Sequence, residues 1–242
     1  MTQNLDKSRL EEGLRQLHIS FSEEQISKLL DYYVMVVEKN KVMNLTAITD
    51  YDEFVEKHFL DSLSLYLIMN LNDSKKVLDL GTGAGFPGIP LKILFPNLNL
   101  TLMDSLNKRI SFLREVIDDL QLKNITAIHG RAEEAARQKE YREQFDLCVS
   151  RAVANISTLS EYCLPFVKPG GCFVSYKAGD VDDEIASAQN AVSVLGGRIS
   201  EVYPFVLPGT DLERTFIKIE KVKKTPRVYP RKAGTPSKNP LK

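Results

Sequence analysis

A glycine-rich turn is the strongest chemical signal in the chain. Residues 81–85 read Gly-Thr-Gly-Ala-Gly and directly follow a short apolar run, 77–80. Glycine lets a backbone turn sharply and approach a ligand where any Cβ would collide. Open α/β sheets bind ligands outside the carboxyl ends of their strands. A glycine turn directly after a strand therefore predicts a cofactor site.

Two cofactor classes compete for this turn. Gly83-x-Gly85-x-x-Gly88 matches the dinucleotide fingerprint, although a single match of this kind is weak evidence. Asp79 favours S-adenosylmethionine (SAM), because a carboxylate two residues before the first glycine would face the cationic amino-acid end of SAM and repel a pyrophosphate. The dense glycine cluster points the same way. We therefore predict SAM contacts from Asp79, Gly81, Gly83 and Gly85, with NAD as the alternative.

Two further carboxylates follow later apolar runs. Asp104 ends the run 100–104 and can accept hydrogen bonds from both hydroxyls of a ribose. It can also cap the helix expected over 107–121. Ala132-Glu133 follows the run 125–129, where adenine contacts usually arise in such folds. On its own, Glu133 would more often be a helix carboxylate in the first turn.

The segment expected to face the substrate lacks two common methylation motifs. Amino-group targets usually require Asn/Asp-Pro-Pro-Tyr/Phe, but this place holds residues 150–153, Ser-Arg-Ala-Val. Carbon-5 of a pyrimidine requires a cysteine, typically in Pro-Cys, and neither Cys148 nor Cys163 has that context. A target with an exposed lone pair remains, such as guanine N7, for which positioning supplies most of the rate. Arg151 would then hold O6 or a phosphate, or else form a structural ion pair.

The elements around these residues alternate between strand and helix patterns. From residue 76 onward, short apolar runs and amphipathic segments take turns, which predicts a doubly wound, mostly parallel seven-stranded sheet. The expected strands are 77–80, 100–104, 125–129, 145–150, 172–177, 199–206 and 215–222, and the expected helices are 87–95, 107–121, 131–140, 155–165 and 182–195. No helix separates the last two strands, so the final strand is antiparallel. That α/β topology is typical of SAM-dependent methyltransferases more than of dinucleotide dehydrogenases.

The first 72 residues predict an N-terminal helical cap, which precedes a SAM-dependent methyltransferase domain over 73–222. Ser22 and Gln25 form a capping-box signature at the start of one helix. Thr49 and Asp52 are expected to open another helix that continues past residue 62. On it, His58 and Asp61 share one face, where they either help to close the active site or form a buried hydrogen-bonded pair.

Composition and charge limit the remaining possibilities. Hydrophobic residues make up 43% of the chain and charged residues 26%, which is ordinary for a soluble protein. No apolar run approaches the roughly 20 residues needed to span a bilayer, and the N-terminus lacks a signal-peptide pattern, so we expect a cytoplasmic protein. Three histidines and three irregularly spaced cysteines predict no metal site.

The net charge of zero conceals an asymmetry. Residues 218–242 hold nine Lys or Arg and one Glu, which gives this end +8 and the remainder −8. Four prolines break every element after residue 223, so 223–242 is expected to be an extended basic tail. Such a tail either contacts RNA or DNA or is merely solvated and disordered.

The motifs taken together resemble the RsmG (GidB) family of bacterial small-subunit ribosomal RNA methyltransferases, essentially from end to end. The resemblance rests on Asn44-Leu45-Thr46, His58-Phe59-Leu60-Asp61-Ser62, Gly81-x-Gly83-x-Gly85-Phe86-Pro87-Gly88-Ile89-Pro90, Asp104-Ser105-Leu106-Asn107-Lys108-Arg109, Arg131-Ala132-Glu133, Ser150-Arg151-Ala152-Val153-Ala154 and Tyr229-Pro230-Arg231-Lys232-x-Gly234-x-Pro236. It implies methyl transfer from SAM to N7 of a guanine in the decoding-region (helix 18) loop of 16S rRNA.

The resemblance also implies roles for single residues. The implied SAM contacts are Gly81, Phe86, Asp104, Ser105, Leu106, Ala132, Glu133 and Arg151. The implied RNA contacts in the tail are Arg227, Arg231, Lys232 and Lys238. Lys177 and Arg214 join Arg151 as candidates for positioning the substrate, and no residue is assigned as certainly catalytic.

The implied partner is 16S rRNA or a small-subunit assembly intermediate, and we expect a monomer. The alternatives are a SAM-dependent methyltransferase for another RNA or a small molecule, a non-catalytic RNA-binding protein with the same fold, and a nicotinamide oxidoreductase.

Overall fold

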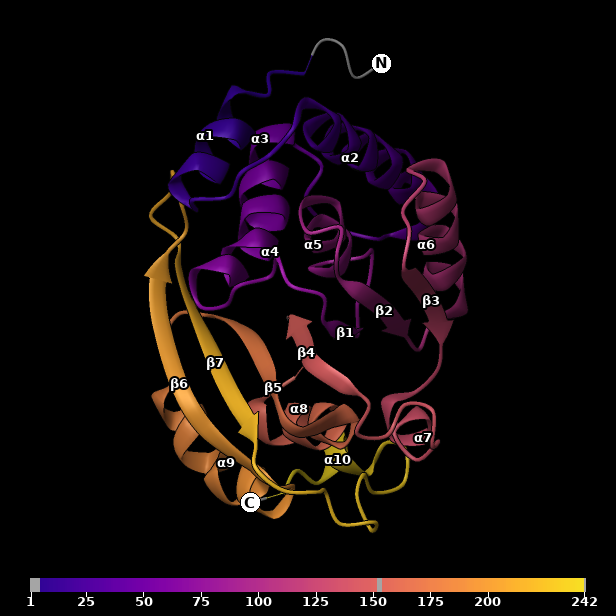
Figure 1. Ribbon diagram of the computed structural model, residues 1–242, viewed down its shortest axis with the longest axis vertical. Helices are drawn as coiled ribbons and strands as arrows, with labels where there is room; N and C mark the ends of the chain where they lie inside the picture. The colour runs from indigo at the N-terminus through magenta and orange to yellow at the C-terminus, as the bar shows by residue number, and fades with distance from the viewer. Residues whose placement is uncertain (1–4, 152–153, 242) are drawn as a thin grey trace.

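A mixed seven-stranded sheet forms the centre of the protein in the computed structural model, which describes residues 5–151 and 154–241 (Figure 1). The strands are β1 (Lys76–Leu80), β2 (Asn99–Asp104), β3 (Ile125–His129), β4 (Phe145–Arg151), β5 (Val167–Ala178), β6 (Gly197–Val206) and β7 (Glu213–Lys221). Their order in the sheet is β3-β2-β1-β4-β5-β7-β6. All seven predicted strands are thereby confirmed, with ends shifted by a few residues.

The pairing directions confirm the predicted topology. Strands β1 to β5 are parallel, whereas β7 lies antiparallel between β5 and β6. The chain order reverses between β1 and β4, because β2 and β3 continue to one side and β5 to the other. In doubly wound sheets this switch point opens a crevice at the carboxyl ends of the strands, where ligands bind. The glycine turn after β1 lies at that crevice.

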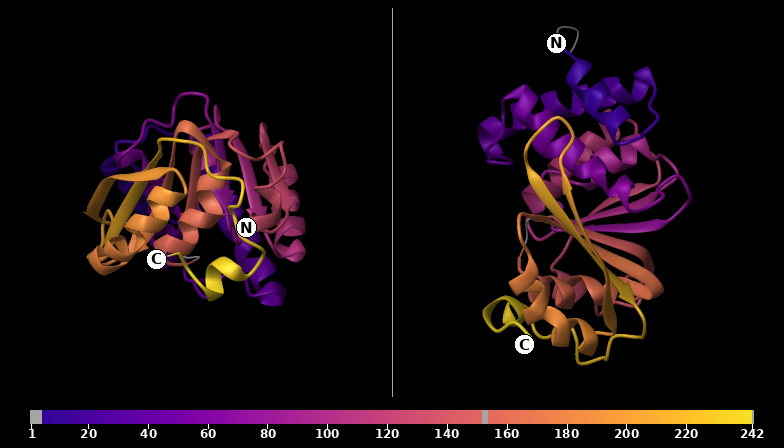
Figure 2. Two further views of the ribbon diagram at one scale, coloured as in Figure 1. Left: turned by 90° about the horizontal axis from the view of Figure 1, so that it is seen from below. Right: turned by 90° about the vertical axis from the view of Figure 1, so that its left-hand side faces the viewer.

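Helices cover both faces of the sheet (Figure 2). One layer contains α1 (Ser8–Gln16), α2 (Glu23–Met43), α3 (Tyr51–Phe54), the π-helix η2 (Val55–Leu60), α4 (Asp61–Leu63), the 3₁₀ helix η3 (Ser64–Leu67), α5 (Gly88–Leu94) and α6 (Asn107–Asp119). The other contains α7 (Ala132–Ala135), α8 (Ile156–Cys163), the 3₁₀ helix η4 (Leu164–Phe166), α9 (Asp182–Val194) and α10 (Thr235–Lys238). The helix predicted over 131–140 is thus only one turn long.

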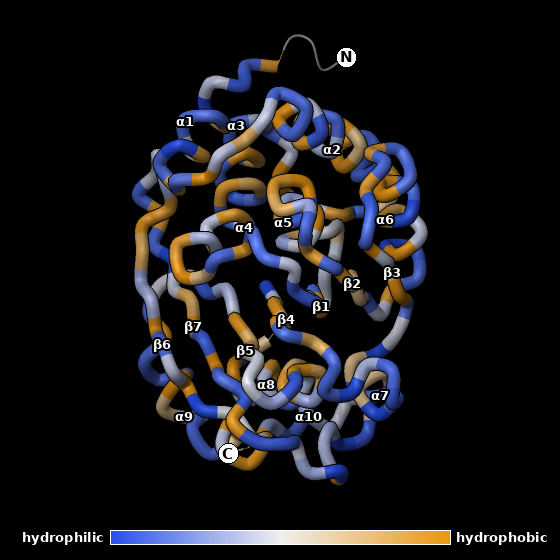
Figure 3. The backbone as a smooth tube through the Cα atoms, in the orientation of Figure 1, coloured by the Kyte–Doolittle hydropathy of each residue, from blue (hydrophilic) through white to orange (hydrophobic). Residues whose placement is uncertain are grey.

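Residue alternation along the strands divides the core between the two layers. Val77 packs in the first layer and its neighbours Leu78 and Leu80 in the second, as the two-residue period of a strand requires. Figure 3 shows hydrophobic and hydrophilic residues alternating along α2 and α6, since each helix packs only one face on the core. The N-terminal helices share the first cluster with β1, β2, α5 and α6 and therefore belong to one continuous core.

The start of α2 confirms one predicted cap, and the start of α3 corrects another. At α2, Ser22 and Gln25 form both hydrogen bonds of the capping box. At α3, the cap is Asp50, whose side chain accepts the amide N–H of Glu53, so the expectation of Thr49 and Asp52 was wrong. Asp50 is the N-cap because its carboxylate accepts the amide N–H of Glu53, three residues later, which is the usual N-cap spacing.

The C-terminal segment differs from the expected extended tail. Residues 223–241 fold back on the second helical layer, and α10 lies beside α8 (Figures 1 and 2). The prolines do exclude long helices here, but backbone groups of this segment form hydrogen bonds with the rest of the protein. Its carbonyl oxygens accept from Arg142, and its amides donate to Glu133, Glu143 and Glu161. Across the part of the chain that the structure describes, no helix has the length and apolar character needed to cross a bilayer.

Candidate functional site

A cavity of about 620 Å³ opens at the carboxyl ends of β1 to β4. Its walls include eight of the predicted cofactor contacts: Gly81, Gly83, Phe86, Asp104, Ser105, Ala132, Glu133 and Arg151. Its other lining residues include Leu45, His58, Arg109, Leu159, Tyr162, Gly234 and Ser237. The volume lies within the range of 300–1,000 Å³ that is typical of small-molecule and cofactor sites.

Backbone conformation explains the glycines of the turn. Gly81, Gly83 and Gly85 all have positive φ, at 73°, 62° and 109°. At Gly83 an added Cβ would have no neighbour within 4 Å, whereas at Gly85 it would lie 2.6 Å from the hydroxyl oxygen of Tyr32. Gly83 therefore lies at the open cavity. Gly85 lies behind it, where the helices of the first layer approach the turn, and is not part of the cavity wall.

The Tyr32 hydroxyl joins the N-terminal helices to this turn. It donates a 2.6 Å hydrogen bond to the carbonyl oxygen of Ala84, and the side chain is fully buried. Burial raises the pKa of Tyr32 well above its ordinary value, so the phenol keeps its proton and remains a donor. α2 thus helps to fix the conformation of the glycine turn, although no pattern in the sequence indicated this contact.

Asp79 organises the turn and does not face the cavity. Its Oδ2 accepts hydrogen bonds from the Thr82 hydroxyl at 2.6 Å and from the Gly88 amide at 2.8 Å. The side chain is fully buried, and burial raises its pKa to about 6. Asp79 is not among the residues that line the cavity, and its contact with the cationic end of SAM stays a prediction. Strand alternation puts Asp79 on the same face as Val77, which α5 covers.

Asp104 lies in the cavity wall and is held by three donors. Its Oδ2 accepts the Gly83 amide at 3.0 Å and an Arg109 guanidinium nitrogen at 3.2 Å, and its Oδ1 accepts the Leu106 amide at 2.9 Å. Leu106 is itself the N-cap position of α6 and has no side-chain cap, so Asp104 shapes the approach to that helix without capping it. The Leu106 side chain is 44% exposed and lies outside the cavity.

Glu133 connects the cavity to the C-terminal segment. Its Oε1 accepts the amide N–H of Gly234 at 2.8 Å, and the residue is buried although it lies in the first turn of α7. Gly234 and Ser237 line the same cavity. The position of Glu133 after β3 agrees with the prediction, whereas the contribution of residues 234–237 was not foreseen.

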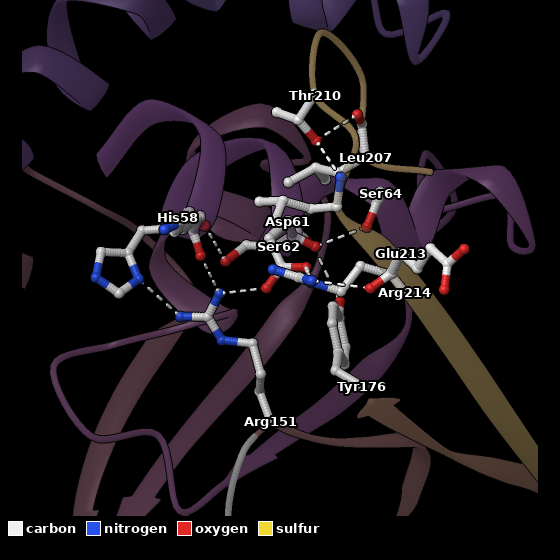
Figure 4. A network of polar contacts seen from close by, with 12 residues as sticks. His58, Asp61, Ser62, Ser64, Arg151, Tyr176, Leu207, Thr210, Glu213 and Arg214 are labelled. Carbon is white, nitrogen blue, oxygen red and sulfur yellow. Dashed lines mark hydrogen bonds and ion pairs between the residues drawn. The ribbon is translucent and has the colours of Figure 1, made fainter. Parts of the chain in front are cut away.

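Arg151, at the end of β4, is the centre of a polar network (Figure 4). Its guanidinium donates to the carbonyl oxygen of Lys57 at 2.9 Å, to Oδ2 of Asp61 at 2.8 Å and to Nδ1 of His58 at 3.0 Å. Arg151 forms a structural ion pair, which was one of the two alternatives, and it also lines the cavity. That it holds O6 or a phosphate stays a prediction. Its neighbours at 152–153 lie outside the described residues.

The hydrogen bonds of this network determine the protonation state and tautomer of His58. A guanidinium can only donate, so Nδ1 of His58 must be unprotonated and the proton lies on Nε2, 2.8 Å from the Thr46 hydroxyl oxygen. Burial and the charge of Arg151 lower the pKa of His58 to about 3. The neutral ring stacks on Phe86, with centroids 4.4 Å apart. His58 and Asp61 are therefore bridged by Arg151 and do not form a pair with each other.

Asp61 is shared by two arginines. Its Oδ1 accepts Nε of Arg214 at 3.0 Å while its Oδ2 holds Arg151. Lys177, the third candidate for positioning substrate, lies apart from this cluster. Its ammonium group contacts Glu184 at 2.6 Å and the carbonyl oxygen of Ala154 at 2.8 Å. The structure thus unites Arg151 and Arg214 through one carboxylate.

The predicted cations of the tail divide into two kinds. Arg231 donates to the buried carboxylate of Glu161 through its backbone amide and its guanidinium. Arg227, Lys232 and Lys238 are exposed. The prediction of phosphate contacts therefore fits the second kind better than Arg231, whose charge is already paired.

The comparisons with known proteins agree with this geometry. The family model described as rRNA small subunit methyltransferase G (GidB) matches residues 25–211. The chain is 55% identical to the ribosomal RNA small subunit methyltransferase G of Lachnoclostridium phytofermentans, over 98% of each chain. It is 49% identical to the protein of that name from Alkaliphilus metalliredigens, over 98% of this chain and 99% of the relative.

Solved structures support the fold. M. jannaschii TYW2 in complex with AdoMet superposes with a TM-score of 0.54 at 16% sequence identity, covering 73% of this chain and 80% of that chain. At this level of identity the similarity shows the fold alone.

Proposed function

The chain belongs to the rRNA small subunit methyltransferase G (GidB) family, and from this premise we propose that it transfers a methyl group from SAM to N7 of a guanine in the decoding-region (helix 18) loop of 16S rRNA. The observation that carries the proposal is one cavity in which the glycine turn, Asp104, Glu133 and the Arg151 network converge. The proposed substrate places the reaction in the cytoplasm.

The cavity suits an adenosine-type cofactor. The space around Gly83 is open, so a ligand can approach its backbone closely. The Asp104 carboxylate can accept hydrogen bonds from ribose hydroxyls once Arg109 releases the Oδ2 atom that it now contacts. Glu133 keeps a second carboxylate oxygen besides the one that holds Gly234. When bound, SAM supplies a methyl group on a sulfonium sulfur. On transfer, the electron pair of the carbon–sulfur bond stays with the sulfur, which becomes a neutral thioether.

The chain's own residues have no proton to remove. Guanine N7 carries a lone pair and no hydrogen, so the attack needs orientation rather than a base. His58 is the imidazole that lines the cavity within the described residues, and hydrogen bonds occupy both of its nitrogens. A neutral ring held in this way can pack and position but does not accept a further proton, which favours a target that already has a free lone pair.

The arginine cluster fits a polyanionic substrate. Arg151 and Arg214 share the single negative charge of Asp61, so the three groups together keep a net charge of +1. A phosphate can balance this charge, whereas the neutral O6 oxygen of guanine can only accept a hydrogen bond; guanidinium groups bind both kinds of oxygen. The exposed cations Arg227, Lys232 and Lys238 would contact phosphates further from the reacting base.

The test uses labelled SAM and ribosomal RNA that lacks the modification. We expect label to enter small subunits or 16S rRNA, and mapping the modified nucleotide should give a guanine in the decoding-region loop. Gly83→Leu, which places a side chain in the cofactor cavity, should abolish incorporation. Label in another RNA, or in no RNA while the protein binds SAM, would favour the alternative of a different substrate.

A further inference from the structure

Residues 225–239 fold against the second helical layer, and we call them the C-terminal clasp. Its first anchor is Arg142, whose guanidinium donates to the carbonyl oxygens of Thr225 at 2.9 Å and Tyr229 at 3.0 Å. The Thr225 amide in turn donates to Glu143 at 2.8 Å. These contacts use backbone groups of the clasp, so they fix its path and not merely one side chain.

A buried ion pair provides the second anchor. Glu161 on α8 is fully buried, and Arg231 satisfies its carboxylate with the backbone amide at 2.7 Å, Nε at 3.0 Å and a terminal nitrogen at 2.7 Å. A buried carboxylate without such a partner would be strongly unfavourable. The buried carboxylate on α8 therefore requires the hydrogen bonds that Arg231 donates, and this requirement holds the clasp against α8.

The third anchor brings the clasp to the cavity. Thr158 donates its hydroxyl to the carbonyl oxygen of Pro236 at 3.2 Å, and the Gly234 amide donates to Glu133 at 2.8 Å. Gly234 has φ +80°, a conformation that turns the backbone toward Glu133 and that glycine adopts readily. Beyond this turn, Ser237 on α10 lies at the cavity.

We propose that the clasp is a wall of the cofactor site: Gly234 orients the Glu133 carboxylate, and Ser237 limits the space at the adenine end. This inference rests on the proposed function, because it assumes that SAM occupies the cavity. The glycine turn supplies part of the lining of that cavity, and a segment about 150 residues later in the sequence supplies another part. The same segment carries the exposed cations Arg227 and Lys232.

The experiment measures binding of S-adenosylhomocysteine to the full-length protein by calorimetry, without RNA. Ser237→Trp puts an indole at the cavity and should weaken binding at least about tenfold. The matched control is Ser193→Trp, at an exposed position of α9 that does not line the cavity, and it should bind like the wild type. Circular dichroism and thermal unfolding of each variant establish that it is folded.

A second measurement needs no substitution. Hydrogen exchange followed by mass spectrometry should show slower exchange of peptides covering 229–239 when the wild type binds S-adenosylhomocysteine. The inference is overturned if Ser237→Trp binds as tightly as the control and exchange in the clasp does not change. A wild type that fails to bind would refute the proposed function as well, so the two failures are distinguishable.

Discussion

Replacing Asp61 by asparagine tests whether one carboxylate holds the substrate side of the site together. The substitution keeps the shape of the side chain and removes its charge. Arg151 and Arg214, whose side chains are 13% and 18% exposed, then lose their shared counter-ion. An asparagine also turns an N–H₂ group toward one of the two guanidinium groups, so at most one of the hydrogen bonds at 2.8 and 3.0 Å survives.

The expected cost follows from the burial of the pairs. Removing one partner of a fully buried ion pair costs about 3–5 kcal/mol. Because both arginines retain some contact with water, we expect the free energy of unfolding to fall by about 2–4 kcal/mol for Asp61→Asn. For a chain of this size that loss corresponds to a decrease in Tm of roughly 5–15 °C. Asp61 itself does not line the cavity, but Arg151 does, so we expect the affinity for S-adenosylhomocysteine to fall by up to about tenfold.

The effect on catalysis separates positioning from simple stability. Once Arg151 is displaced, methyl transfer at saturating SAM should slow about 10- to 100-fold, even well below the Tm of the variant. Asp52→Asn is the matched control, because Asp52 is 60% exposed and lies 3.5 Å from Arg9 in a surface pair that contributes little to stability. Equal Tm values for Asp61→Asn and Asp52→Asn would refute the network as described, and an unchanged rate would refute the positioning role of Asp61.

Three further predictions concern the elements around the cofactor cavity. Gly88→Ala should destabilise the protein by about 1–3 kcal/mol and weaken SAM binding, because its Cβ would lie 2.7 Å from Oδ2 of Asp79; urea unfolding and calorimetry measure both effects. Tyr32→Phe should cost about 1–3 kcal/mol in urea unfolding, since the carbonyl oxygen of Ala84 loses its donor in a buried place. Because the pKa of His58 is lowered to about 3, stability should fall with decreasing pH below 6.5, and His58→Gln should lose about 1–2 kcal/mol less than the wild type between pH 7 and 5.

Each of these predictions has an internal check. Gly130→Ala adds the same methyl group where the nearest atom is 4.0 Å away and should unfold like the wild type. A Tyr32→Phe protein of unchanged stability would show that the contact with the glycine turn contributes nothing. For His58 the sign is the test: the unfolded imidazole binds a proton near pH 6.5 and the native one does not, so acid must favour the unfolded state. A wild type and variant with parallel pH profiles would contradict the assigned neutral ring.

The fold was accessible from the sequence because local patterns agree with the global arrangement. β1 and β2 are short apolar runs, and α6, which follows β2, shows one apolar face. Such consistency between levels is what makes a fold predictable. The antiparallel β7 was also predictable, since no helix pattern separates it from β6 and a short connection can only join antiparallel neighbours.

The site was predictable only where it follows strand ends. Asp104 ends β2 and Glu133 follows β3, so the topology alone brings them to the crevice. The burial of Asp79 away from the cavity lining could not be predicted, because both faces of a doubly wound sheet are buried and strand alternation does not indicate which side faces a ligand. The Tyr32 hydroxyl and the Gly234 amide act across 52 and 101 residues, and no periodicity reports contacts of that kind.

The clasp shows why a composition rich in lysine, arginine and proline was insufficient to predict its structure. The same composition fits a flexible tail or an ordered segment, and which one forms depends on whether side chains elsewhere in the protein bond to it. Those partners are Glu133 and Glu161, two acidic groups that are buried on α7 and α8 and that need donors from elsewhere. A predicted buried face that contains a glutamate is thus a useful signal, because a buried charge requires a partner somewhere in the chain. Here the partner is the segment that was interpreted as free for RNA, so the cofactor cavity and the proposed RNA surface meet in one short stretch of chain.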